Sequence, residues 1–207
     1  MTARRAGRGE TTRKALMDAA LRQVARGRSF DALSLRKLTQ SVGIVPTAFY
    51  RHFESMEALG LALVDESLRT LRRMMREARE QPVPHEQVIR SSVTTYVHYL
   101  QANRLHFHFI MRERFGGVAT LRQGIHNGIQ LFVSELATDM GRFPVLDRWS
   151  AGDLRMIAGL IVAAVTEATD LILNAPEDDA DAEAEIINTT TRQLRLIVLA
   201  VPQWRSS

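Results

Sequence analysis

Three side chains on one face of a short predicted helix are of the types that contact DNA bases. Thr47, Ala48 and Arg51 follow Pro46, and at about 100° per residue they point to one side of a helix. An arginine guanidinium donates to the edge of a guanine, and the methyl groups of threonine and alanine contact the thymine methyl. The segment therefore predicts contact with base edges in a DNA major groove.

The flanks of this helix and the start of the preceding one carry side chains suited to phosphate oxygens. Tyr50 and His52 lie on the two flanks, while Arg36 and Lys37 lie near the start of the preceding predicted helix. Such contacts, together with the free amides of a helix N-terminus, position a protein on DNA but read little sequence. The predicted DNA-binding set is Ser34, Arg36, Lys37, Pro46, Thr47, Ala48, Tyr50, Arg51 and His52.

Capping and turn residues divide this segment into two short helices. Ser34 is predicted to cap the first, which ends near Ser41, and Gly43 suits the left-handed position that follows. Pro46 suits the first position of the second helix. Phe49 and Phe53, four residues apart, share the opposite face and are predicted to form a small core with Leu35, Leu38 and Ile44. This pattern predicts a helix-turn-helix.

The charge distribution agrees with a nucleic-acid-binding N-terminus. Residues 1–53 hold eleven Lys/Arg and three Asp/Glu, a net charge of +8, whereas the remainder has a net charge of −4. Charge alone would fit a solvated arginine-rich surface equally well. The arginines at positions 4, 5 and 8 form an arm that either follows the DNA backbone or minor groove, or is a disordered tail.

The rest of the chain reads as helices without an alternating strand pattern. Further helices are predicted at about 11–26, 55–81, 86–102, 104–115, 118–141, 151–174 and 178–201, with Gly116-Gly117 in a connecting loop. We therefore predict an all-α protein. Its head, residues 1–54, is the helix-turn-helix DNA-binding domain, and residues 55–207 form a helical ligand-binding and dimerisation domain.

Several functions lack the residues they need. The chain has no cysteine, and its histidines lack an acidic or thiolate partner set, so no metal site and no cofactor is predicted. No phosphate-binding glycine loop or nucleophile motif is present, and we predict no enzyme. The basic N-terminus is not followed by an apolar stretch, and the longest apolar run is too short for a membrane span. We expect a cytoplasmic protein that does not engage a membrane.

The segment from about Thr11 to Leu63 resembles the DNA-binding head of the TetR family of bacterial transcriptional regulators. The resemblance rests on Ala19-Ala20, Ser34-Leu35-Arg36, Gly43-Ile44, Phe49 to Phe53 and Leu59. Ser29 to Phe53, Glu57 to Ser67 and Arg112-Glu113-Arg114 further resemble the branch that represses unsaturated fatty acid synthesis (FabR- and DesT-like). Val45 replaces the usual Ser or Thr cap, and Met56 stands near the place of a common lysine. These two departures put one contact with the DNA backbone in doubt. Members of the fatty-acid branch tend to lack both residues, so the departures favour a resemblance to that branch.

A head of this kind needs a second copy, because one helix-turn-helix makes few base contacts. A twofold dimer places two recognition helices about 34–36 Å apart on a palindromic operator. The last two long helices have apolar stripes that predict the dimer interface, although a buried core without dimerisation is the alternative. The interface candidates are Leu154, Ile157, Ile161, Val165, Ile172, Ile187, Leu194 and Val198.

An apolar pocket is expected between the middle helices, a common place for a ligand in a bundle. The candidate lining residues, most of which would serve as core, are Tyr96, Tyr99, Leu100, Phe107, Ile110, Met111, Arg112, Phe115, Phe132 and Glu167. Glu167 and Asp170 either pair with an arginine or face solvent. The resemblance implies a small hydrophobic effector, an acyl chain carried as acyl-CoA or on acyl carrier protein (acyl-ACP), and a repressor of fatty acid biosynthesis genes. A TetR-type repressor answering to a drug, and an acyl-binding carrier without DNA function, are the alternatives.

Overall fold

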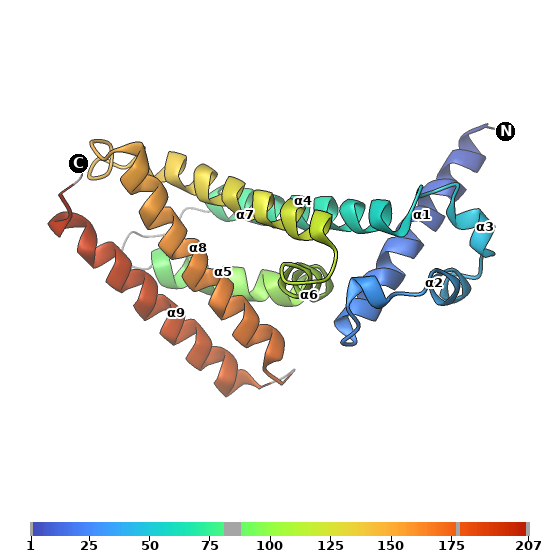
Figure 1. Cartoon of the computed structure of the whole chain (residues 1–207). Coiled ribbons are helices and arrows are strands. Elements are labelled where there is room, and N and C mark those ends of the chain that lie inside the picture. Colours follow the sequence, from blue (N-terminus) through green and yellow to red (C-terminus); the bar gives the residue numbers. More distant parts are fainter. Residues whose placement is uncertain (1, 81–87, 177–178, 206–207) are drawn as a thin grey trace. The chain divides into compact units, whose positions relative to one another are not determined.

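The computed structural model describes residues 2–80, 88–176 and 179–205, and side chains within 9–73, 89–176 and 179–205. The described chain is all-α, as predicted, and Figure 1 follows its helices in order. Their bounds are α1 Thr2–Ala25, η1 Phe30–Ala32, α2 Leu35–Ser41, α3 Pro46–Phe49, α4 Met56–Glu80, α5 Val88–Ala102, α6 Arg104–Glu113, α7 Ala119–Met140, α8 Ala151–Asn174, α9 Ala180–Ala200 and η3 Val201–Gln203.

Two predicted helix boundaries need correction. The first helix begins at Thr2 and not near Thr11, so the segment expected to be an arm or a tail is the start of α1. The regular part of α3 ends at Phe49, whereas the sequence suggested that the helix continues to Phe53. The first residues of the helices predicted at 86–102 and 178–201, namely 86–87 and 178, lie outside the described residues.

The chain divides into two compact units. Unit 1 comprises residues 1–71 and 105–126, and unit 2 comprises residues 72–104 and 127–207. Unit 1 therefore holds the helix-turn-helix together with α6, which follows it by more than fifty residues in the sequence. The predicted domain boundary between residues 54 and 55 does not coincide with this division, and it stays a prediction about function.

The core of unit 1 joins the apolar stripe of α1 to the buried faces of α2, α3 and α4. The first helix buries Leu16, Ala20 and Val24 at helical spacing. Leu59 and Leu63, four residues apart on α4, are both fully buried. Ser55 caps α4 by accepting a hydrogen bond from the Ala58 N–H at 3.0 Å. These contacts fix the elements that carry the predicted DNA-binding side chains.

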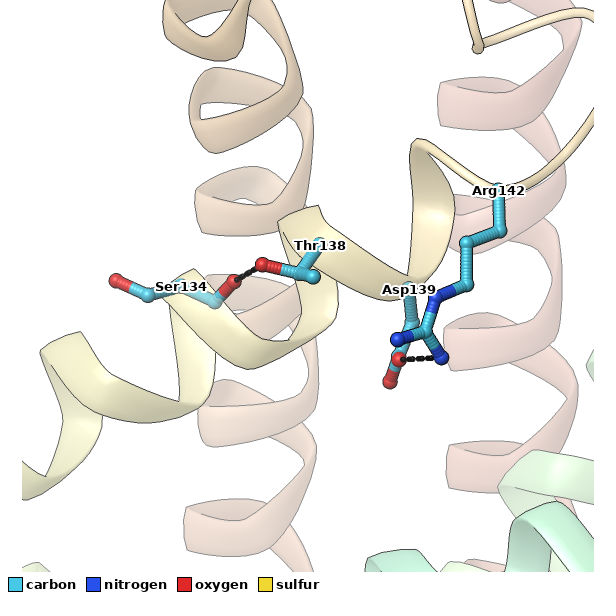
Figure 2. Close-up of polar contacts among 4 residues, drawn as sticks. All are labelled: Ser134, Thr138, Asp139 and Arg142. Carbon is cyan, nitrogen blue, oxygen red and sulfur yellow. Dashed lines mark hydrogen bonds and ion pairs between the residues drawn. The ribbon is translucent and has the colours of Figure 1, made fainter.

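Unit 2 is a helical bundle in which α5 packs against α8 and α9, and α8 and α9 run side by side (Figure 1). One of its core clusters joins α7, α8 and η3 through Val133, Ala137, Ile157, Ala158 and Val201, among others. Figure 2 shows the end of α7, where the Thr138 hydroxyl donates to the Ser134 carbonyl at 2.9 Å and Arg142 pairs with Asp139 at 3.3 Å. The Thr138 hydroxyl thus makes its hydrogen bond within α7.

Helix α8 is apolar on nearly every side. Among the described residues it is long and apolar enough to cross a membrane by length and composition alone, and 33% of its most apolar window is buried in this chain. Ser150 caps it by accepting a hydrogen bond from the Asp153 N–H at 3.2 Å. The rest of its apolar surface therefore needs an explanation beyond the core of unit 2.

Candidate functional site

The turn between α2 and α3 has the geometry that the sequence predicts. Ser34 accepts a hydrogen bond from the Lys37 N–H, and Gly43 has a φ of +75°. The Gly43 N–H donates to the Gln40 carbonyl at 3.1 Å, and the Ile44 N–H donates to the Thr39 carbonyl at 3.0 Å. This pair of bonds is the Schellman arrangement, which ends α2 and turns the chain toward α3. The helix-turn-helix geometry is confirmed.

Helix α3 is short and continues as hydrogen-bonded turns. Pro46 occupies its first turn, and Val45 provides no side-chain cap, both as predicted. The Arg51 N–H donates to the Ala48 carbonyl at 3.2 Å, and the His52 N–H donates to the Phe49 carbonyl at 2.8 Å. The hydrogen-bonded turns thus continue the chain to His52 beyond the regular helix, and Arg51 is exposed there, as Thr47 is on α3.

Two aromatic side chains hold this segment to the rest of unit 1. Phe49 is fully buried and Phe53 is 4% exposed, and their ring centroids are 5.7 Å apart. The Arg13 guanidinium of α1 lies 4.2 Å from the Phe53 ring centroid and donates to the His52 carbonyl at 2.8 Å. The sequence did not predict this role of Arg13, because Arg13 lies 39 residues before His52 and is one of several basic residues on α1.

The side chains predicted to meet DNA remain open to solvent. Pro46, Thr47 and Arg51 are exposed and Ala48 is half-buried, while Tyr50 is 59% exposed. On α2, Arg36 and Lys37 are exposed at its N-terminal end, and Ser34 and His52 are half-buried. The buried aromatic pair and the exposed polar face thus lie on opposite sides of one segment. This arrangement suits entry into a groove with phosphate contacts along its edges.

The predicted ligand-binding residues divide between the two units. Tyr96, Tyr99, Leu100, Phe132 and Glu167 belong to unit 2. The Tyr96 hydroxyl shares a hydrogen bond of 2.5 Å with the Thr169 hydroxyl, and burial raises the pKa of Tyr96 to about 12. Leu100 and Phe132 are buried core residues, whereas Glu167 is exposed on α8. Of the two alternatives for Glu167, the structure has it facing solvent.

The other predicted ligand-binding residues, on and after α6, belong to unit 1. Phe107 is buried, Ile110 and Met111 are half-buried, and Phe115 is 77% exposed. Arg112 is exposed and donates to the Gly27 carbonyl at 2.5 Å. The ten predicted residues are therefore divided between the two units, and a pocket lined by them stays a prediction.

Both units contain a cleft, and neither cleft is lined by the predicted ligand-binding residues. The cleft in unit 1 has a volume of about 220 Å³ and is lined by Glu10, Arg13, Lys14, Met17, Asp18, Leu21, Leu63, Glu66 and His106. His106 Nδ1 in that cleft lies 2.9 Å from the buried Ser67 hydroxyl. The cleft in unit 2, about 30 Å³, lies beside Arg104 and the start of α9. Among the described residues, no group of three or more acidic, histidine or cysteine side chains has the geometry of a metal site.

The predicted dimer residues fall on two faces of α8 and α9. Ile157, Ile172 and Ile187 are buried within unit 2, and Leu154, Ile161, Val165 and Leu194 are partly buried there. Of the predicted set, Val198 alone is exposed, at 45%. Large apolar side chains outside that set are open to solvent instead, namely Met156, Leu160 and Leu171 on α8 and Leu196 and Leu199 on α9. The stripe predicted for the interface is thus mostly the core-facing side of these helices.

Comparison with known proteins agrees with this architecture. Residues 84–199 match the family described as "Tetracyclin repressor-like, C-terminal domain", and residues 16–63 match "Bacterial regulatory proteins, tetR family". Among solved structures, a transcriptional regulator from Pseudomonas aeruginosa PAO1 is similar with a TM-score of 0.71 and 14% identity over 95% of both chains. GusR of Salmonella enterica is similar with a TM-score of 0.69 and 20% identity, over 91% of this chain and 96% of that one.

A third similar structure is that of a protein bound to an acyl-CoA. FadR of Bacillus subtilis, in complex with stearoyl-CoA, has a TM-score of 0.66 and 16% identity, over 89% of this chain and 97% of its own. At these identities the likenesses show the fold, while the family matches cover both the head and the C-terminal domain. This chain belongs to the TetR family of bacterial transcriptional regulators, which are DNA-binding proteins and not enzymes.

Proposed function

We propose that this protein is a dimeric, cytoplasmic TetR-type repressor that controls fatty acid biosynthesis genes, those for unsaturated chains in particular, in response to long-chain acyl-CoA or to a long-chain acyl group on acyl carrier protein (acyl-ACP). Its heads bind a palindromic operator through Thr47, Ala48 and Arg51. The observation that carries the DNA-binding part is the exposed face of α3, held from behind by buried Phe49 and Phe53.

The effector part has two supports. The sequence resembles the fatty-acid branch in its head and at Arg112 to Arg114. Proteins of similar fold include the fatty acid degradation regulator FadR of Bacillus halodurans and FadR of Bacillus subtilis in complex with stearoyl-CoA. An effector acts only through its different affinity for the DNA-bound and free states. Saturated and unsaturated acyl chains differ in shape, so one kind of chain would favour DNA binding and the other would favour release of the DNA.

We place the dimer interface on the exposed face of α8 and α9. Met156, Leu160 and Leu171 recur along one side of α8, and Leu196 is 72% and Leu199 71% exposed on α9. An apolar helix surface of this kind is costly in water. A second copy related by a twofold axis would cover the same surface on both chains. This also accounts for the apolar character of α8 without a membrane.

A DNA-binding experiment with effectors tests the proposal. DNA that the wild-type protein selects from a random pool serves as the probe, and binding is followed by gel shift with saturated and unsaturated acyl-CoA of several lengths. Free coenzyme A is the control. We expect at least one acyl chain to change DNA binding at micromolar concentration. If no chain does and a hydrophobic drug releases the DNA, the drug-responsive alternative replaces fatty acid control.

A charge reversal tests the assignment of the recognition face. Arg51→Glu removes a side chain that donates to guanine, a contact worth about 1–3 kcal/mol of discrimination per base pair. We expect selective binding to the selected DNA to be lost. Arg22→Glu is the matched control, because Arg22 is an exposed arginine on α1 in the same unit with the same charge change. Equal losses from both variants would mean that only the charge of the head matters.

A further inference from the structure

The end of α6 is tied to the loop that joins α1 to α2. Arg112 Nη2 donates to the Gly27 carbonyl at 2.5 Å, and the Phe30 N–H donates to Glu113 Oε1 at 2.9 Å. The rings of Phe30 and Phe109 meet edge to face with centroids 6.1 Å apart. Two hydrogen bonds between α6 side chains and the loop backbone, together with one aromatic contact, therefore hold the same short loop.

Glu113 is the unusual member of this contact. Its side chain is fully buried, and its Oε2 atom has no hydrogen-bond partner among the described residues. The groups that face it are the Phe30 amide and Asp31 from the loop, and Arg112 from its own helix. Burying a carboxyl group with one oxygen unsatisfied is unfavourable. An apolar side chain would fill this space at a lower cost, but it would leave the Phe30 N–H unpaired.

The Gly116-Gly117 pair makes room for two carboxyl groups at this contact. A Cβ atom on Gly116 would lie 2.2 Å from Glu113 Oε2, and one on Gly117 would lie 2.2 Å from Asp31 Oδ2. Asp31 is itself held by the Ser29 hydroxyl, which donates to its Oδ1. Two consecutive residues without side chains thus let the loop after α6 close over the carboxyl groups of Glu113 and Asp31.

The held loop leads directly into the DNA-binding helices. Phe30 lies four residues before Ser34, the cap of α2, and its ring would lie 2.8 Å from a Cβ atom on Gly60 of α4. The loop that carries Phe30 is thus continuous with the cap of α2, and the Schellman turn joins α2 to α3. Although α6 lies within the C-terminal family match, it packs in the same compact unit as the head.

We propose that Glu113 is a positioning residue for DNA recognition, whose buried carboxyl group fixes the loop Gly27 to Asp31 and so the orientation of α2 and α3. This goes beyond the proposed function, because it concerns DNA affinity and holds for any effector. Glu113 touches no DNA and acts through the Phe30 N–H. An amide side chain at this position keeps the acceptor oxygen, whereas a methyl group removes it.

The test compares three full-length variants on DNA selected by the wild-type protein, with affinity measured by fluorescence anisotropy at pH 7. Glu113→Ala is expected to weaken binding about 2- to 10-fold, the equivalent of one lost hydrogen bond. Glu113→Gln is expected to remain within about 2-fold of the wild type, since its amide oxygen accepts the same bond. Glu57→Gln is the control, because exposed Glu57 accepts a bond from the Thr120 hydroxyl within the same unit.

Hydrogen exchange of the Phe30 amide separates positioning from general stability. Exchange should be slow in the wild type and Glu113→Gln and fast in Glu113→Ala. If Glu113→Ala does not fold, Gly116→Ala replaces it, since the added methyl group displaces the carboxyl group without removing it, and the same loss is expected. Unchanged DNA affinity with a freed Phe30 amide would overturn the proposal. A loss in Glu113→Gln equal to that in Glu113→Ala would overturn it too.

Discussion

Replacement of Gly60 by alanine is expected to destabilise unit 1, although alanine is the better helix former. In a helix interior the exchange gains about 0.8–1 kcal/mol from propensity. The new Cβ atom, however, would lie 2.8 Å from Phe30 Cε1 and 2.9 Å from both methyl groups of Leu121. Phe30 is 3% exposed and Leu121 fully buried, so neither side chain has space to withdraw. Overpacking of this kind costs about 1–3 kcal/mol, which leaves a net loss of about 0–2 kcal/mol.

Gly124→Ala is the matched control in the same unit. Its Cβ atom would lie 3.4 Å from Val64 Cγ1, which is ordinary van der Waals contact, so the propensity gain of about 1 kcal/mol should remain. The two variants are therefore expected to differ by about 1–3 kcal/mol in the free energy of unfolding. The assay is urea denaturation followed by circular dichroism at one fixed protein concentration, because dimerisation makes stability concentration-dependent.

Tryptophan fluorescence recorded in parallel follows the unfolding of unit 2, and so separates it from a loss of packing around Gly60 in unit 1. Trp149 and Trp204 both belong to unit 2, so their signal does not report directly on the packing around Gly60. Equal stabilisation by Gly60→Ala and Gly124→Ala would refute the reasoning. It would mean that the loop carrying Phe30 is not packed against α4 as tightly as the distances indicate.

Four further outcomes follow from named contacts. Val45→Ser supplies the missing cap of α3 and should raise the free energy of unfolding by about 1 kcal/mol, measured with urea; no change would mean that solvent already satisfies these amides. Burial raises the pKa of Glu113 above its ordinary value of 4.5, so the stability it contributes is present at low pH and lost as pH rises through that raised pKa; Glu113→Gln should gain on the wild type in thermal unfolding as pH rises above 4.5, and parallel profiles would contradict this. Leu160→Glu should yield monomers in sedimentation velocity, whereas Val145→Glu, at a 63% exposed loop residue, should leave the dimer intact. Lys37→Ala should reduce the slope of log K against log salt by about 2, one phosphate contact per head; an unchanged slope would remove Lys37 from the interface.

The head could be predicted closely because its determinants are local. The Ser34 cap, the left-handed Gly43 and Pro46 at the start of α3 each act within a few residues, and the structure has all three. The inward pairing of Phe49 and Phe53 needed only the helical repeat. The family resemblance of the head rests on the same residues and is confirmed by the family matches.

The support of the head could not be predicted, because it comes from far along the chain. Arg13 contacts the segment after α3 from 39 residues away, and Glu113 contacts Phe30 across 83 residues. Arg112 and Glu113 read as part of a basic motif near a ligand, and nothing local indicates that they hold the α1–α2 loop. The glycine pair that follows read as a simple connection.

Local sequence patterns were enough to establish that this protein is all-α and that its N-terminal segment is a helix-turn-helix with buried Phe49 and Phe53. The side of α8 that the chain covers with its own residues could be learned only from the packing of unit 2. Because α8 is apolar on nearly all sides, its periodicity alone selects no face. Ile157 and Ile172 pack into unit 2, whereas Met156, Leu160 and Leu171 on the same helix are exposed. Local rules suffice where one face is polar, and packing decides where none is.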